Sequence, residues 1–178
     1  NKPQQRKPGE SRPIRPFAWP MLLQSGKLAQ RTGDKLQLTK AGNKAISAPA
    51  NGTIKKLWHS WQKTTLFDEF RRVSAFRGQT GKGKRHMTAV AKRRAVIVEA
   101  LQQCPPGEWL TFDEFSRWMR SERFYFEVTR DPNSLYIDSS RYGRLGYKNW
   151  GLIEERYMLA FLFEYAATLG IIDVAYVD

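Results

Sequence analysis

The pattern of hydrophobic and polar residues begins with a short apolar run over 17–26, which ends in glycine and predicts a short helix. Two stretches of alternating apolar and polar residues follow, 27–32 and 35–39, with a Gly-Asp pair between them. This alternation around a turn predicts an antiparallel β-hairpin. The apolar face of the hairpin consists of Leu28, Leu36 and Leu38. A threonine then precedes residues 40–47 and should cap a short helix.

Helical spacing of apolar residues returns over 53–73, where two apolar stripes are expected to face the core. Their members are Ile54, Leu57, Trp58 and Trp61, followed by Leu66, Phe67 and Phe70. Base stacking by Trp58 or Trp61 is the less favoured alternative, because stacking platforms usually lie on exposed sheets or loops. Residues 77–86 combine three glycines with four basic residues, offer nothing to pack, and predict a solvated loop.

Residues 88–103 predict another helix. Its core-facing residues are Val90, Ile97 and Leu101. A Pro-Pro-Gly sequence breaks this helix, and a brief strand is expected at 107–110. Thr111 and Glu114 have the spacing of a capping box ahead of an aromatic stripe, which predicts a helix over 111–123.

The stretch 124–148 mixes aromatic residues with turn formers and predicts an ordered loop with a possible short strand. A long amphipathic helix over 150–169 follows, and the alternating residues 171–177 predict a strand. This order matches a winged helix-turn-helix unit cut off as its wing begins, and the earlier helix, basic hairpin and short helix match the end of another. The sequence therefore predicts a mainly α fold with small β-hairpins, a tandem winged helix-turn-helix whose first and last units are incomplete.

This interpretation divides the chain into four parts. Residues 1–16, rich in proline and basic side chains, form a flexible basic arm, or alternatively a linker with incidental charge. Residues 17–48 form the C-terminal part of a first winged helix including its wing. Residues 49–87 form a helical linker with the basic loop, and residues 88–178 form a second winged helix, truncated in its wing. Because the chain begins without Met, we interpret it as a fragment or processed piece.

Charge is distributed unevenly along the 178 residues. The first hundred residues carry 22 basic and 5 acidic side chains, the rest carry 8 and 12, and the total is +13. Such an excess predicts a polyanionic partner. The residues expected to contact phosphates come from the hairpin, the loop and the following helix: Lys27, Arg31, Lys35, Lys40, Arg77, Lys82, Lys84, Arg85, Lys92, Arg93 and Arg94.

The chain contains no convincing catalytic constellation. Gly78–Arg85 matches the phosphate-loop pattern up to its lysine, but Arg85 stands where a hydroxyl should bind magnesium. His59, His86 and Cys104 are not spaced as metal ligands, and adjacent carboxylates on a helix do not face each other. We therefore predict no enzyme, no cofactor and no metal. One cysteine and the lack of an apolar run of about 18 residues predict a cytoplasmic protein, nucleoid-associated if prokaryotic, without a membrane partner.

Four stretches resemble a known class of module. They are LQLTKAGNKAI, IKKLWHSWQ, KRRAVIVEALQQCPPGEWLTFDEFSRWMR, and the C-terminal aromatic helix with LGIIDVAYVD. In this order they are similar to the winged-helix modules of helicase-associated proteins, such as the N-terminal region of XPB-type helicases. The resemblance implies an accessory, DNA-contacting region of a larger protein or complex whose motor lies elsewhere. The chain departs from it in the basic loop at 77–86 and in the irregular stretch 124–148.

The leading hypothesis is a nucleic-acid-binding accessory module of a helicase-type or larger DNA-processing complex, which holds double-stranded DNA mainly through its phosphates. A protein-interaction scaffold is the main alternative, with the acidic, aromatic C-terminal half docking a helicase, nuclease or other effector. RNA binding and transcriptional regulation are further alternatives.

Overall fold

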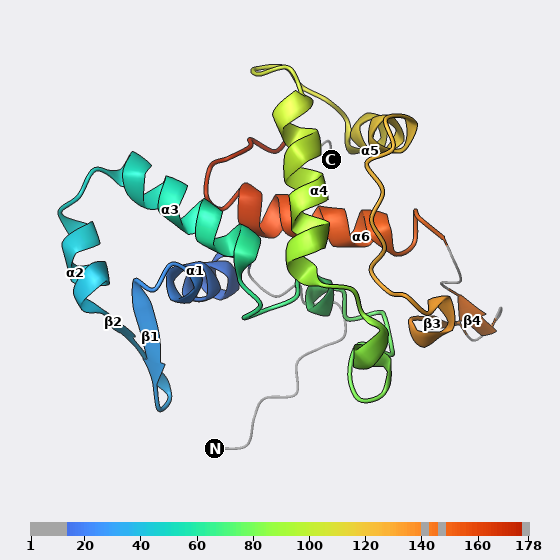
Figure 1. The fold of residues 1–178 in the computed structure, drawn as a ribbon, viewed down its shortest axis with the longest axis horizontal. Helices are drawn as coiled ribbons and strands as arrows, with labels where there is room; N and C mark the ends of the chain where they lie inside the picture. Colours follow the sequence, from blue (N-terminus) through green and yellow to red (C-terminus); the bar gives the residue numbers. More distant parts are fainter. Residues whose placement is uncertain (1–13, 140–142, 146–148, 176–178) are drawn as a thin grey trace.

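The computed structural model describes residues 14–139, 143–145 and 149–175, and within these ranges the chain is mainly helical (Figure 1). The α-helices are α1 (Ile14–Ser25), α2 (Lys40–Ile46), α3 (Ala50–Lys63), α4 (Val90–Gln103), α5 (Phe112–Ser121) and α6 (Glu154–Leu159). The π-helix η4 (Ala160–Ala166) continues α6, and the 3-10 turns are η1 (Glu69–Arg72), η2 (Gly83–His86) and η3 (Pro132–Ser134). Two separate antiparallel hairpins pair β1 (Ala29–Thr32) with β2 (Lys35–Leu38), and β3 (Ile137–Ser139) with β4 (Gly143–Leu145). No helix in these ranges is both long and apolar enough to cross a bilayer.

The first hairpin and the short helix after it confirm the local sequence signals. Gly33 adopts a φ of +61° in the turn between β1 and β2, a conformation that glycine reaches without strain. The hydroxyl of Thr39 accepts the N–H of Gly42 at 3.0 Å and so caps α2. Gly42 packs directly against the backbone of Leu28, since a Cβ at position 42 would be 1.9 Å from the carbonyl oxygen of Leu28.

The expected apolar face of the hairpin is only partly buried. Leu28 is 3% exposed, whereas Leu36 and Leu38 are 41% and 47% exposed. Figure 1 shows the β1–β2 hairpin at the edge of the molecule, beside α1 and α2, and all four residues of β2 are exposed. The prediction that Leu28, Leu36 and Leu38 form one apolar face is wrong, because the register pairs Ala29 with Leu38 and so turns Leu28 to the opposite, buried side.

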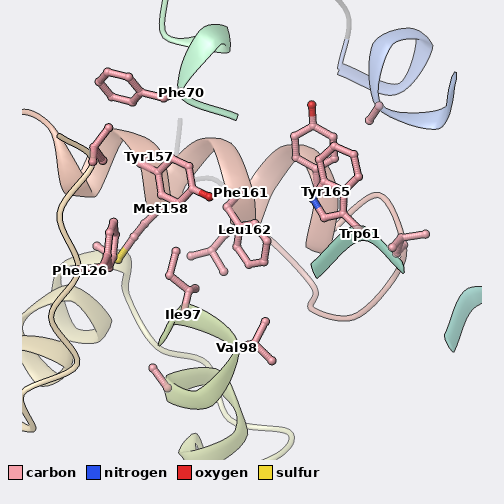
Figure 2. Packing of buried hydrophobic residues seen from close by; sticks show 14 of the residues in the cluster. Trp61, Phe70, Ile97, Val98, Phe126, Tyr157, Met158, Phe161, Leu162 and Tyr165 are labelled. Atoms are coloured by element: carbon pink, nitrogen blue, oxygen red, sulfur yellow. The ribbon is translucent and has the colours of Figure 1, made fainter. Parts of the chain in front are cut away.

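One hydrophobic cluster runs through the described chain from α1 to η4. Figure 2 shows its centre, where Trp61 stacks on Tyr165 with 4.2 Å between ring centroids, and Phe161 and Ile97 lie close by. Trp61 and Phe70 have no exposed surface. Residues 49–87, predicted as a linker, thus contribute central core side chains, because aromatic stripes of this size need neighbouring elements to cover them.

Other boundaries also differ from the prediction. Residues 14–16 begin α1 and do not belong to a basic arm, while 1–13 lie outside the described residues. Neither 107–110 nor 171–175 forms a strand, and the end of the second predicted strand lies outside the described residues. The alternation over 171–175 therefore did not produce a strand, and no strand of the described residues pairs with this segment. The capping box at Thr111 is confirmed, and the β3–β4 hairpin occupies the stretch that was predicted to be irregular.

Candidate nucleic-acid interface

The glycine-rich loop, residues 77–86, is folded back against a distant part of the chain. Gly78 has a φ of +88°, and a Cβ there would lie 1.7 Å from the carbonyl oxygen of Ser134. A Cβ on Gly83 would lie 2.1 Å from the carbonyl oxygen of Gly78. Only glycine permits such close backbone approaches. Most side chains of the loop are exposed, as expected of a solvated loop, but the expectation that it has nothing to pack is wrong, because its backbone packs against Ser134 and against itself.

Hydrogen bonds fix the first half of this loop. Arg77 forms a β-bridge with Tyr136, whose carbonyl accepts the Arg77 N–H at 2.8 Å. The Gln79 side chain is buried, and its Nε2 donates to the carbonyl oxygens of Val73 at 2.9 Å and Phe76 at 3.2 Å. These bonds give the loop a defined conformation without apolar side chains of its own.

The last residues of the loop are held by the chain that follows α5. The Arg130 N–H donates to the carbonyl oxygen of His86 at 2.8 Å, and the Thr88 N–H donates to that of Val128 at 3.0 Å. The Val128 N–H in turn donates to Oε1 of Glu154 at 3.1 Å. Burial raises the pKa of the Glu154 carboxyl to about 7, although the bond from Val128 favours its charged form.

Three cations of the loop are available to an external anion. Lys82, Lys84 and Arg85 are all exposed, and none of them forms an ion pair with a described residue. Because a 3-10 helix has three residues per turn, Lys82 and Arg85 lie on the same side of η2. The loop thus presents unneutralised positive charge from a turn of fixed shape.

Lys84 also lines an open groove of about 300 Å³. Arg71 of η1 is exposed and lines the same groove, so a second cation from a different element lies beside the loop. Thr88 and Val90, at the start of α4, also line the groove, and Ala89 between them provides no side-chain cap. The N-terminus of this 14-residue helix carries a positive partial charge. The cations and the helix terminus both attract an anion, and the Asp68 carboxylate, which also lines the groove, is paired with Arg93.

The structure adds two cations that were not predicted from the sequence. Arg71 is added because it lines the groove. Arg130 is added because its backbone N–H bonds to His86, which places it beside the loop. The adjacent cations Arg71 and Arg72 could have pointed to Arg71 in the sequence, whereas the irregular stretch around Arg130 contains no such pattern. We call the whole set the basic loop surface, and its members are Arg71, Arg77, Lys82, Lys84, Arg85, Lys92 and Arg130, all exposed.

Arg93 and Arg94 do not belong to this surface, in contrast to the prediction. Their exposed fractions are 1% and 0%. Arg94 Nε donates to Oε1 of Glu69 at 2.6 Å, and the Arg93 guanidinium donates to both carboxylate oxygens of Asp68, at 3.1 and 2.5 Å. Since both guanidinium groups are neutralised inside the protein, they cannot reach a phosphate.

The buried Glu69 carboxylate organises the interior beneath the groove. It also accepts the indole N–H of Trp61 at 2.9 Å and the hydroxyl of Tyr157 at 3.0 Å. Burial raises the pKa of Glu69, and the charge and hydrogen bond of Arg94 oppose that shift. Arg94 NH1 further donates to the carbonyl oxygens of Trp61 and Thr64, at 2.5 and 2.6 Å. The network joins α3, η1, α4 and α6, and so positions Arg71 relative to the start of α4.

The hairpin cations are exposed but do not share one face. They are Lys27, Arg31, Lys35 and Lys40. Arg31 pairs across the hairpin with Leu36, so the two side chains share a face, whereas Lys35 pairs with Thr32 on the opposite face. The Arg31 guanidinium is also held at the turn, where Nε donates to the carbonyl oxygen of Gly33 at 2.8 Å and NH2 lies 3.4 Å from the Asp34 carboxylate.

Comparison with protein families, with curated proteins and with solved structures found no match. The chemistry of the basic loop surface therefore carries the functional argument. Its cations and exposed backbone can hold a polyanion by charge and hydrogen bonding.

Proposed function

We propose that the chain binds nucleic acid, with double-stranded DNA as the preferred form, through phosphate contacts made by the basic loop surface. The observation that carries the proposal is the set of three loop cations, Lys82, Lys84 and Arg85, exposed without ion-pair partners on a hydrogen-bonded turn. Phosphate recognition requires positive charge and exposed donors, and a turn of fixed shape loses little entropy on binding. Binding of this kind is independent of base sequence.

The proposal extends to the fold type and the setting. The order of α1, the β1–β2 hairpin and α2 supports a winged-helix origin for this part of the chain. Exposed Lys27, Lys35 and Lys40 would add phosphate contacts from the hairpin. An accessory role in a helicase-type or larger DNA-processing complex, in the cytoplasm, completes the proposal.

Charge reversal within the loop tests the proposal. The triple variant Lys82→Glu/Lys84→Glu/Arg85→Glu should bind a fluorescent duplex about 100-fold more weakly at 100 mM salt, since each phosphate contact releases about one counterion. The control is Lys55→Glu/Lys56→Glu/Lys63→Glu, which changes three exposed cations of α3 and shifts the net charge equally. We expect a much smaller loss for the control, and equal losses would contradict the assignment.

The salt dependence gives a second measure of the same contacts. If six to ten cations contact phosphates, affinity should fall by roughly 10³ to 10⁵ between 50 and 200 mM salt, and the loop triple variant should lower the slope by about three. Competition with structured RNA decides the form of nucleic acid. A flat salt response would rule out phosphate binding, and stronger competition by RNA would replace DNA as the preferred ligand.

A further inference from the structure

The groove beside the basic loop is lined by more than cations. Its volume of about 300 Å³ lies at the lower end of the range for small-molecule sites. Next to the cations Arg71 and Lys84, its lining includes the apolar side chains of Leu66, Phe67 and Met87. A phosphate contact needs positive charge and hydrogen-bond donors, and it gains nothing from apolar walls. The groove therefore fits a ligand that carries an apolar part beside its charge.

The apolar side of the groove is open to solvent at Leu66, which is 49% exposed. The Leu66 N–H donates to Oγ1 of Thr64 at 3.2 Å. The carbonyl oxygen of the next residue, Phe67, accepts NH2 of Arg94 at 2.7 Å. Because these bonds fix the backbone on both sides, Leu66 offers a preformed apolar contact to a ligand.

A hydrogen-bond acceptor of fixed orientation also lines the groove. The Gln79 side chain is 8% exposed, and its Nε2 donates to the backbone carbonyls of Val73 and Phe76. Its Oε1 is buried and has no hydrogen-bond partner among the residues that the structure describes. Buried polar atoms of proteins are nearly always paired. The amide oxygen therefore favours a ligand with an N–H or O–H donor.

The polar side of the groove attracts an anion. Arg71 and Lys84 are exposed and form no ion pair with a described residue. Asp68 is the one acid among the described lining residues. Its carboxylate already accepts two bonds from the Arg93 guanidinium and the N–H of Phe70. The positive charge of the groove is therefore available to a ligand.

A nucleotide with an unpaired base combines the three properties that the groove requires. Its base has an apolar face, its Watson–Crick edge carries an N–H donor, and its phosphate carries the charge. In a duplex the faces are stacked and the edges are paired, so these contacts become available at a single-stranded position. Inorganic phosphate, by contrast, would leave Leu66 and Gln79 without a contact.

We propose that the groove binds an unpaired nucleotide, whose base packs on Leu66 and donates to Gln79 Oε1 while its phosphate meets Arg71 and Lys84. This inference rests on the proposed function, because the loop cations bring the nucleic acid to the groove. It adds a preference for a duplex that carries a single-stranded tail. A free nucleotide offers the same chemistry, so the test includes one.

Fluorescence anisotropy on the full chain compares two tailed duplexes of equal charge. One carries a short thymidine tail, and the other carries an abasic tail of the same length, which keeps the phosphates and lacks the bases. We expect the wild type to bind the thymidine-tailed duplex about fivefold or more tightly, because a single base contact contributes at least this much. Thymidine monophosphate serves as the competitor that represents a free nucleotide.

The variant Leu66→Ala should bind the two duplexes equally, with unchanged affinity for the abasic one. Leu66 is about half exposed, so the variant should fold, which circular dichroism and its melting temperature will check. Leu66→Met keeps an apolar side chain and should retain the preference. Leu110→Ala is the matched control, because Leu110 is 45% exposed outside the groove, and it should also retain the preference.

The possible results separate this inference from the proposed function. Equal affinity of the wild type for the two tailed duplexes would overturn the inference and leave phosphate binding intact. Full preference in Leu66→Ala, or an equal loss of affinity for both duplexes, would also overturn it. Absence of binding to either duplex would contradict the proposed function, and the inference with it.

The competitor identifies the source of the nucleotide. If thymidine monophosphate abolishes the preference of the wild type for the thymidine tail, the groove accepts free nucleotides as well as those of a strand. If the preference persists in its presence, the site is specific for a nucleotide within a strand. Both results support the groove as the binding site, provided that the preference depends on Leu66.

Discussion

Arg94 was predicted to contact phosphate, but its side chain is buried, and the helical period of α4 explains why. Lys92, Arg93 and Arg94 form a run of cations at the start of α4, yet only Lys92 is exposed. Val90 and Ile97 are buried on the same helix, and positions 93 and 94 lie between them at i+3 and i+4. The helical period therefore directs both arginines inward, where the adjacent acids Asp68 and Glu69 neutralise them.

At this scale we predict that Arg94→Met destabilises the protein by about 3–5 kcal/mol, because it leaves the Glu69 carboxylate buried without its cation. Urea unfolding followed by tryptophan fluorescence measures the loss. Lys92→Met is the control, since a substitution at this exposed position two residues away should change stability by no more than about 0.5 kcal/mol. Equal effects of the two substitutions would contradict a structural role for the buried ion pair.

At the scale of the element, the basic loop depends on two glycines more than on any apolar contact. Gly78 and Gly83 allow the backbone to fold onto itself and onto Ser134, and this packing fixes the direction of Lys82, Lys84 and Arg85. The contributions of the loop's charge and of its shape can therefore be separated experimentally, because a substitution at a glycine changes the shape of the loop and leaves its charge unchanged.

We predict that Gly78→Ala displaces the loop, since the new Cβ cannot occupy a position 1.7 Å from a carbonyl oxygen. Trypsin should then cleave after Lys82, Lys84 or Arg85 faster than in the wild type, and duplex DNA affinity should fall at unchanged net charge. Gly81→Ala is the control: Gly81 has a φ of +61° but open space around it, so backbone strain of about 1 kcal/mol is the expected cost. Identical proteolysis of the two variants would show that the close approach is unimportant.

At the scale of the whole molecule, the predicted units share their core. Leu22 of α1, Trp61 of α3, Phe70 of η1 and Ile97 of α4 belong to the same cluster as Phe161 of η4. The buried carboxylate of Glu69 also comes from the part that was expected to be a linker. Separation at the predicted boundaries would therefore divide both the apolar core and its polar network.

We predict that residues 88–178, expressed alone, do not fold cooperatively, because they lack Trp61 and Phe70 and leave Arg94 without an acid. Near-ultraviolet circular dichroism and dye binding to exposed apolar surface measure the outcome, with the full chain as the reference. A sharp unfolding transition of the fragment, with native near-ultraviolet signals, would restore residues 88–178 as an independent domain.

The sequence by itself determined features that depend on neighbours a few residues apart. The Gly-Asp turn of the first hairpin, the cap of α2 by Thr39 and the capping box of Thr111 with Glu114 all follow from such short spacings. The uneven charge is likewise a property of composition, and it supports the proposed polyanionic ligand. These signals are local, so they can be recognised in the sequence without knowledge of any tertiary contact.

Only the tertiary structure decided which of the cations and leucines face solvent. The buried Arg94 side chain pairs with Glu69, which is 25 residues away in the sequence. The glycine-rich loop packs against the backbone of Ser134, more than 50 residues beyond Gly78. Leu36 and Leu38 alternate as the residues of a half-buried strand do, yet their side chains remain 41% and 47% exposed. The solvent exposure of a side chain depends on the residues that pack against it. Here those residues are distant in the sequence, so the local sequence pattern does not reveal them.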